Sequence, residues 1–224
     1  MEGNMTIAQT TAEALARYES AFKEERLIQL AWHNEQDGRH LACALGVLGD
    51  EVGGPADCPA AIMPRWLAQM VPGFFDRQKF DDAKDWGMRF YKALDRIGGK
   101  APFSVIHDWH ANTVCQLGID AAELRKRDAA PHKALQTLHQ RALAGEKIGA
   151  DKWRTVLRDA DAYAYAYAYA DADEDAYAYA YAYAYAYADA DAWRLLADGM
   201  VDALNRVGGL NDRQNQTEAH RTGA

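Results

Sequence analysis

The stretch ADAYAYAYAYADADEDAYAYAYAYAYAYADADAW spans residues 160–193 and organises the rest of the chain. Every odd position from Asp161 to Asp191 is Tyr or Asp, and every even position is Ala except Glu174. This two-residue period contains ten of the twelve tyrosines of the 224-residue protein. Because a repeat is not itself an activity, it predicts architecture more directly than chemistry.

Two secondary structures fit the repeat. Strict alternation favours a long β-hairpin, with acidic residues 171–175 at its turn, because successive side chains of a strand point to opposite faces. Alanine is the best helix former, whereas Ala and Asp are depleted in strands. Apolar residues on both sides of the repeat also have helical spacing. Two helices, or one interrupted helix, are therefore the preferred prediction, and the hairpin is the alternative.

The remainder of the chain carries a succession of helix signals. Helices are predicted from Thr11 to near His33, over 38–49, from Pro64 to a stop at Pro72 and Gly73, over 81–97, from Ser104 to Gly118, and from Pro131 through Leu143. No strand is predicted outside the repeat. The fold class is all-α, a multi-helix body with a C-terminal Ala/Tyr-repeat helical arm.

Three segments follow from this pattern. The helical body covers residues 1–150, and the arm with its helical flanks covers 151–207. Trp153 and Trp193 are predicted to anchor the two ends of the repeat. The polar residues 208–224 are predicted to form a disordered tail.

Composition limits the possible functions. A net charge of −8 argues against general nucleic-acid binding, which requires clustered Lys and Arg, and is compatible with a basic protein partner. Three widely spaced cysteines, Cys43, Cys58 and Cys115, predict a reduced compartment and no disulfide scaffold. The N-terminus has no apolar signal core, and no run is long enough to span a membrane. The sequence therefore predicts a cytoplasmic protein.

The residues CPAAIMPRWLA (58–68), preceded by GRHLACALGVLGDEV (38–52), resemble a group of uncharacterised bacterial and phage-encoded helical proteins. The shared pattern is Cys-Pro-x-x-x-Met-Pro-x-Trp-Leu-Ala, and the group also tends to end in Ala-rich repeats. The resemblance covers most of residues 25–207. It implies no catalytic residue, since the group has no established activity.

Histidine and aspartate residues form the main candidate for chemistry. His107 and His110 are three residues apart and share a helix face, with Asp108 between them. The candidate metal ligands are His33, His40, His107 and Asp108, with Asp151 or Asp159 as a further ligand. Such a set is similar to that of HD-type phosphohydrolases. Surface or structural histidines are the alternative interpretation.

Two other patterns predict no site. Cys115 could act as a nucleophile with His110 only through a tertiary contact, and a buried structural cysteine is the better interpretation. The string Asp171-x-Asp173-x-Asp175 resembles the start of a calcium loop, but the required glycine and final acid are replaced by alanine. No catalytic residue and no resident cofactor are predicted.

The tyrosines of the repeat form a candidate binding surface, because Tyr offers a large contact area at low entropic cost. Its candidate contact residues are Tyr163, Tyr165, Tyr167, Tyr169, Tyr177, Tyr179, Tyr181, Tyr183, Tyr185 and Tyr187. A spacer is the alternative interpretation. The acidic residues could also imitate nucleic acid and occupy a basic protein. The predicted function is a non-enzymatic protein-interaction or accessory factor, phage-associated, with a protein partner; the alternative is a metal-dependent hydrolase.

Overall fold

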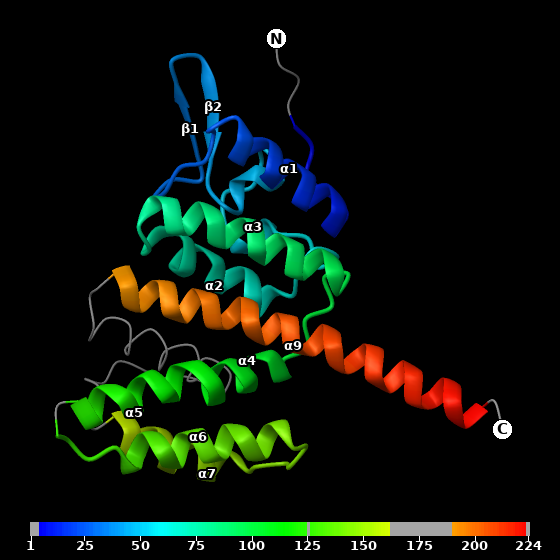
Figure 1. Ribbon diagram of the computed structural model, residues 1–224. Helices are drawn as coiled ribbons and strands as arrows, with labels where there is room; N and C mark the ends of the chain where they lie inside the picture. Colours follow the sequence, from blue (N-terminus) through cyan, green and yellow to red (C-terminus); the bar gives the residue numbers. More distant parts are fainter. Residues whose placement is uncertain (1–4, 125, 162–189, 223–224) are drawn as a thin grey trace. The chain divides into compact units, whose positions relative to one another are not determined.

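A computed structural model describes the chain except for residues 1–4, 125, 162–189 and 223–224 (Figure 1). Its helices are α1 (Thr11–Lys23), α2 (Arg65–Asp76), α3 (Phe80–Arg96), α4 (Ser104–Trp109), α5 (Cys115–Leu124), α6 (Ala130–Leu143), α7 (Ala150–Asp161) and α9 (Ala190–Thr222). A π-helical turn, His110–Val114, connects α4 to α5. Strands β1 (His33–Gln36) and β2 (Arg39–Ala42) pair in antiparallel orientation. The described chain is predominantly all-α, which confirms the predicted fold class.

The chain divides into two compact units. The first unit contains residues 1–101 and 204–224, and the second unit contains residues 102–203. The sequence predicts a different grouping, into a body over 1–150 and an arm over 151–207. In the structure, α7 and the first part of α9 are grouped with α4, α5 and α6.

Helices α1 and α3 pack closely in the first unit (Figure 1). Tyr18 of α1 is fully buried, and its hydroxyl donates a hydrogen bond of 3.0 Å to the carbonyl of Lys84. A Cβ atom added at Gly87 would lie 2.1 Å from the Tyr18 hydroxyl oxygen. Gly87 is therefore required for the close approach of the two helices, since real Cβ atoms do not come so near an oxygen.

Helix α3 presents an aromatic stripe to the core. Trp86 stacks on Phe90 with ring centroids 4.9 Å apart, and Phe74 of α2 lies 5.6 Å from Trp86. Helix α3 ends as the sequence predicts, because Gly98 and Gly99 follow it with φ angles of +57° and +72°. The predicted helix over 81–97 is thus confirmed.

The hairpin replaces parts of two predicted helices. The helix that begins at Thr11 ends at Lys23 and not near His33. Of the predicted helix over 38–49, only a short 3-10 turn, Gly46–Leu48, is helical. The prediction that no strand lies outside the repeat is therefore wrong.

Turn chemistry explains this difference. Asp37 and Gly38 join the strands with φ angles of +53° and +72°, which a type I′ turn requires. The far side of β2 is also paired, because Ala42 donates to the Arg26 carbonyl over 2.9 Å and accepts from the Ile28 amide over 3.0 Å. Asp-Gly is a strong hairpin signal, and here it outweighs the helical spacing of the flanking residues.

Two predicted helix stops are also wrong. Helix α2 runs through Pro72 to Asp76, and α5 runs through Gly118 to Leu124. In both cases burial competes with local propensity: α2 buries Phe74 and Phe75 after the proline, and Gly118 is itself buried in its helix. The predicted helix at Pro131 is confirmed as α6.

The C-terminal helix is longer than the sequence predicts. Helix α9 continues to Thr222, whereas a disordered tail is predicted from Gly208. Seven of the fifteen residues over 208–222 are Leu, Arg, Gln, Glu or Ala, which are good helix formers, and a helix that has already begun at Ala190 propagates through them at lower cost than a new one would form. The choice between helix and hairpin for the repeat concerns residues 162–189, which lie outside the described residues.

In the second unit, α9 packs against the end of α4 and the π-helical turn that follows it. The indole Nε1 of Trp109 donates a 2.8 Å hydrogen bond to the Leu196 carbonyl. A Cβ atom at Gly199 would lie 2.2 Å from the hydroxyl oxygen of Thr113, so this glycine permits a close contact. Trp193, a predicted anchor, is 5% exposed.

Replacing Gly87 tests the packing of α1 on α3. We expect Gly87→Ala to lower the free energy of unfolding by about 1–3 kcal/mol, because the new methyl group overlaps the Tyr18 hydroxyl. Urea denaturation followed by circular dichroism measures this change. Gly149→Ala is the matched control, since nothing lies within 4 Å of a Cβ atom there. Equal unfolding midpoints for the two variants would contradict the packing argument.

Candidate functional site

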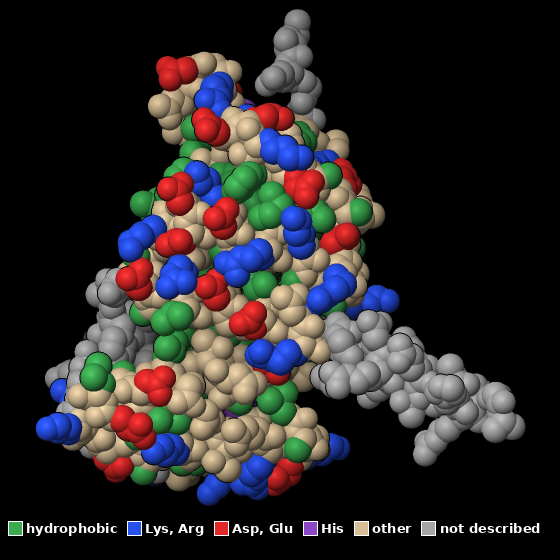
Figure 2. Space-filling model, in the orientation of Figure 1, with side chains coloured by type: hydrophobic (Ala, Val, Ile, Leu, Met, Phe, Trp, Pro, Cys, Tyr) green, Lys and Arg blue, Asp and Glu red, His purple; other side chains and the backbone are tan. Residues whose placement is uncertain are grey.

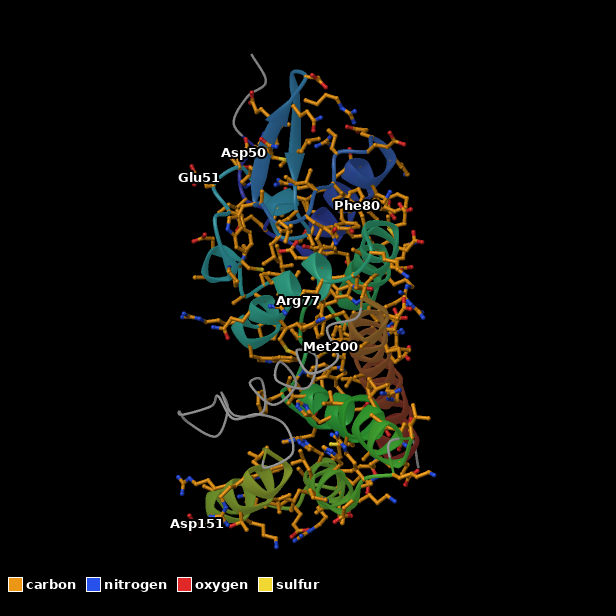
Figure 3. The ribbon with its side chains drawn as sticks, turned by 90° about the vertical axis from the view of Figure 1, so that its left-hand side faces the viewer. Asp50, Glu51, Arg77, Phe80, Asp151 and Met200 are labelled. Carbon is orange, nitrogen blue, oxygen red and sulfur yellow. The ribbon has the colours of Figure 1, made fainter. Side chains whose placement is uncertain are left out.

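The predicted metal ligands His33 and His40 lie together on one face of the hairpin. His33 Nδ1 is 3.2 Å from His40 Nε2, and His33 Nε2 is 2.9 Å from the Val52 carbonyl. The Val52 carbonyl only accepts, so His33 Nε2 carries hydrogen and its Nδ1 accepts from His40 Nε2–H. Asp50, labelled in Figure 3, lies beside the pair with Oδ1 3.5 Å from His40 Nε2.

The other two predicted ligands belong to the second unit. His107 Nδ1 lies 3.0 Å from His139 Nδ1, and Asp108 accepts a 3.2 Å hydrogen bond from the Asn112 amide. The structure thus brings His33 and His40 together, while His107 and Asp108 are part of a separate compact unit. Within the described part of the chain, no group of three or more His, Cys, Asp or Glu side chains could hold a metal ion.

The further ligands proposed from the sequence have other placements. Asp151 forms an exposed ion pair of 2.8 Å with Arg154 at the start of α7. The side chain of Asp159 lies outside the described part of the structure.

His107 belongs to a cluster of aromatic rings that also contains His110, His139 and Trp153. The His110 and His139 rings stack with centroids 4.5 Å apart, and the His107 ring stacks on Trp153 at 5.6 Å. His110 Nδ1 donates to the Ile106 carbonyl over 2.9 Å. Since Trp153 contacts both His107 and His139, this cluster attaches α7 to α4 and α6.

Burial keeps His139 neutral. Its side chain is 1% exposed and its Nε2 atom has no hydrogen-bond partner. Desolvation lowers the pKa of His139 far below its usual value, and the neighbouring His110 and His107 lower it further. The ring therefore packs as an uncharged aromatic group at neutral pH.

The three cysteines are unsuited to nucleophilic chemistry. All three are free thiols, and Cys115 is fully buried. Burial raises the pKa of the Cys58 and Cys115 thiols to about 12, and it also raises the pKa of Cys43. Since the thiolate is the reactive species, these residues are structural at neutral pH.

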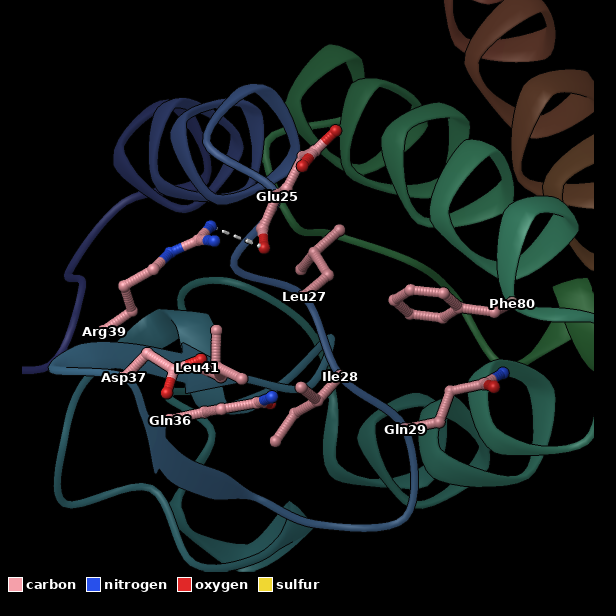
Figure 4. Close-up of a pocket in the computed structure, with 9 residues that line it drawn as sticks. All are labelled: Glu25, Leu27, Ile28, Gln29, Gln36, Asp37, Arg39, Leu41 and Phe80. Atoms are coloured by element: carbon pink, nitrogen blue, oxygen red, sulfur yellow. Dashed lines mark hydrogen bonds between the residues drawn. The ribbon is translucent and has the colours of Figure 1, made fainter.

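A pocket opens in the first unit beside the hairpin, with a cavity volume of about 420 Å³ (Figure 4). Three segments form its walls: the chain after α1, the hairpin and the start of α3. Its lining residues are Glu25, Leu27, Ile28, Gln29, Gln36, Asp37, Arg39, Leu41 and Phe80. Residues from three separate segments therefore converge on one site.

The pocket has an apolar floor and a polar rim. Leu27 and Leu41 are buried, whereas Phe80 is 40% exposed and directs its ring towards Leu27 (Figure 4). Arg39 donates to the carbonyls of Glu24 and Glu25, the latter over 2.9 Å. An apolar surface bordered by polar groups is typical of a binding site for a small molecule or a peptide side chain.

Leu30 directly follows the pocket residue Gln29 and has an unusual conformation. Its side chain is 82% exposed and its φ angle is +65°. The Leu30 amide donates a 3.0 Å hydrogen bond to Asp76, whose pKa is raised by burial. A left-handed conformation is an outlier for a bulky residue, and such strain concentrates at functional sites.

Strain at the other left-handed residues has a local explanation. Glu25 follows the end of α1, where the Arg26 amide bonds back to Ala21 over 2.8 Å, as in a helix C-terminal cap. Lys126 has the same relation to α5, and Asp37 belongs to the hairpin turn. Among the described non-glycine residues, Leu30 alone has a positive φ that neither a cap nor the hairpin turn accounts for.

The sequence does not reveal this pocket, because its pattern predicts one helix that runs to about His33 and another that begins at residue 38. The available signal was the pair Asp37-Gly38, which would have identified the hairpin. The ten tyrosines predicted to bind a partner lie within residues 162–189, outside the described residues.

The visible surface carries charges of both signs. Figure 2 shows Lys and Arg side chains interspersed with Asp and Glu over the face that it presents. No helix among the described residues combines the length and apolar character needed to cross a bilayer.

No protein-family model, no curated protein and no solved structure matches the chain. Function must therefore be inferred from the sites themselves.

The neutral state of His139 predicts acid sensitivity. Its folded-state pKa is lowered, so below pH ~6.5 the unfolded chain binds a proton that the folded chain does not. We expect the free energy of unfolding to fall by about 1.4 kcal/mol between pH 7.5 and pH 5.5 through this group. Urea titrations at the two pH values measure the loss. His139→Phe should reduce the pH dependence by this amount; an unchanged dependence would contradict the assignment.

Proposed function

We propose that this protein is a non-enzymatic protein-interaction or accessory factor, and that the pocket beside the hairpin binds a segment of its partner. The observation that carries the proposal is Leu30, a large apolar residue held in a strained conformation and directed to solvent. The phage association implied by the sequence resemblance belongs to this proposal. The tyrosine repeat is a second proposed contact surface of the same protein.

Exposed apolar groups of this kind suit a protein partner. Leu30 and Phe80 are 82% and 40% exposed, and both adjoin or line the pocket. Burying such side chains against a partner removes apolar surface from water, which is the main favourable contribution to association. The side-chain amide of Gln29 already has partners within the chain, since its Nε2 donates to the carbonyls of Phe75 and Gln78 over 2.5 and 3.1 Å. These bonds hold the strained segment in place before binding.

Selection from a displayed library of random peptides tests the proposal. We expect the intact chain to enrich peptides whose binding falls at least tenfold in Leu30→Asn and in Phe80→Ala, the loss typical of an interface residue at the centre of a contact. Asparagine tolerates a positive φ, so Leu30→Asn removes the apolar group without adding strain.

Leu124→Asn is the matched control, because Leu124 is 85% exposed but is not part of the pocket. Peptides that bind Leu30→Asn and Phe80→Ala as tightly as the intact chain would contradict a role for the pocket. A parallel selection with Tyr→Ser at all ten repeat tyrosines separates the pocket from the repeat: peptides lost only there bind the repeat.

A metal-dependent hydrolase that holds its ion at His33 and His40 is the second candidate; His107 and Asp108, the other ligands predicted from the sequence, belong to the second unit. The specific observation that favours it is the His33–His40 pair, with ring nitrogens 3.2 Å apart. Ligands of one tetrahedral zinc ion have a similar separation, given Zn–N distances of about 2.0–2.1 Å. His33 also donates to the Val52 carbonyl, which is a common outer contact of a metal-bound histidine.

Calorimetric titration with Zn²⁺ tests this candidate. If an ion binds at the hairpin, we expect one equivalent to bind and His40→Gln to weaken it by at least tenfold, because one of two ring ligands is lost. Asp108→Asn, in the second unit, is the control, and we expect it to leave binding at the hairpin unchanged. Absence of stoichiometric binding to the intact chain would exclude zinc at these residues.

A further inference from the structure

We infer that the pocket beside the hairpin is selective for a basic peptide segment, in which an apolar side chain is adjacent to Lys or Arg. This inference rests on the proposed function and adds the chemistry of the partner. The evidence for it is the set of charged groups around the pocket and the partners that those groups already have within the chain.

The acidic groups at the pocket are available to a partner. Among the described residues, neither the Glu25 carboxylate nor the Asp37 carboxylate forms a hydrogen bond or an ion pair, and both residues are exposed. Figure 4 shows the Glu25 carboxylate directed away from Arg39, whose guanidinium donates to the backbone carbonyls of Glu24 and Glu25 and not to that carboxylate. Glu35, on β1 near the turn, is a third exposed carboxylate without a partner among the described residues.

The two basic side chains near the pocket, Arg39 and Arg26, make hydrogen bonds or ion pairs within the chain. Arg39 donates to the carbonyls of Glu24 and Glu25, and Arg26 forms a 2.6 Å ion pair with Glu24. Residues 24–41 contain four acidic and two basic side chains, so with neutral histidines their net charge is −2. Hydrogen bonds to carbonyls leave the positive charge of Arg39 in place, but the pocket lining sets two carboxylates, Glu25 and Asp37, against this one guanidinium. The net negative charge of the lining favours a cation of the partner over an anion.

The apolar floor selects the neighbouring residue of the partner. Phe80, Leu27 and Leu41 offer apolar contacts, and a cavity of about 420 Å³ accommodates one or two large side chains. The Lys84 ammonium group lies 4.8 Å from the centre of the Phe80 ring and is paired with Asp81 over 2.8 Å. Since Lys84 is neutralised by this pair, it leaves the acidic character of the rim intact.

The Gln36 amide adds a polar contact for the partner backbone. It lies in β1, lines the pocket and has no hydrogen-bond partner among the described residues. An amide side chain provides both a donor and an acceptor, which match one peptide unit. The site thus combines an apolar contact, a peptide contact and a cation contact.

Two synthetic peptides of equal length test the inference on the full chain. One carries Leu-Lys-Phe-Arg in a Gly/Ser context, and the other carries Leu-Glu-Phe-Asp. Fluorescence anisotropy measures their affinities in low and physiological salt. We expect the basic peptide to bind at least tenfold more tightly, and its affinity to fall with added salt, because the rim contacts are exposed charges.

The double variant Glu25→Gln, Asp37→Asn removes the rim charges without a large change in shape, and asparagine tolerates the positive φ of the turn. We expect it to reduce the preference for the basic peptide to less than threefold. Asp120→Asn, an exposed carboxylate of the second unit, is the control for a general loss of negative charge. If both peptides bind equally well and Phe80→Ala weakens both, the inferred selectivity is wrong while the binding pocket stands. If neither peptide binds, and the random library yields no peptide sensitive to Phe80→Ala, the proposed function itself fails.

Discussion

The buried pair Tyr18 and Tyr91 is the constraint on which the first unit depends. Their ring centroids are 5.1 Å apart, and burial raises the pKa of both hydroxyls. The Tyr18 hydroxyl donates to the Lys84 carbonyl, and the Tyr91 hydroxyl donates to the Ala44 carbonyl over 2.6 Å. Each buried hydroxyl is thus satisfied, as burial of a polar group requires. Through these bonds α3 is tied both to α1 and to the chain that follows β2.

The pocket is a consequence of this arrangement. Once α1 and the segment after β2 are fixed against α3, the chain between them must leave α1 and return as the hairpin within residues 24–42. It does so with left-handed residues at Glu25, Leu30 and Asp37. The first and last of these have conventional roles in a helix cap and a turn. Of the three left-handed residues in this stretch, Leu30, which directly follows the pocket residue Gln29, is therefore the one whose backbone strain has no local explanation.

How much of this could be predicted depended on the length of the pattern. Helices α3 and α6 were predictable, since their apolar residues recur over several turns between clear start and stop signals. The hairpin was not, because four-residue strands provide too few positions to distinguish a period of two from one of 3.6. The predicted helix stops at Pro72 and Gly118 are wrong for another reason: local propensity is outweighed where the surrounding residues are buried.

The candidate sites show the same limit. Spacing of three residues correctly places His107 and His110 on neighbouring helical turns, but it cannot reveal that His139 and Trp153, which are 29 and 43 residues after His110, complete the cluster. The contact between His33 and His40 arises because the hairpin turn brings the two strands together in a register that pairs His40 with Glu35, two residues after His33 on the same face. In both units the sequence identifies the histidines, whereas tertiary packing determines which residues they contact. The pocket is an extreme case, since Phe80 and Leu27 are separated by more than fifty residues and neither carries a motif. The strongest indication of function in the first unit is consequently a backbone angle at Leu30, which composition and spacing do not encode.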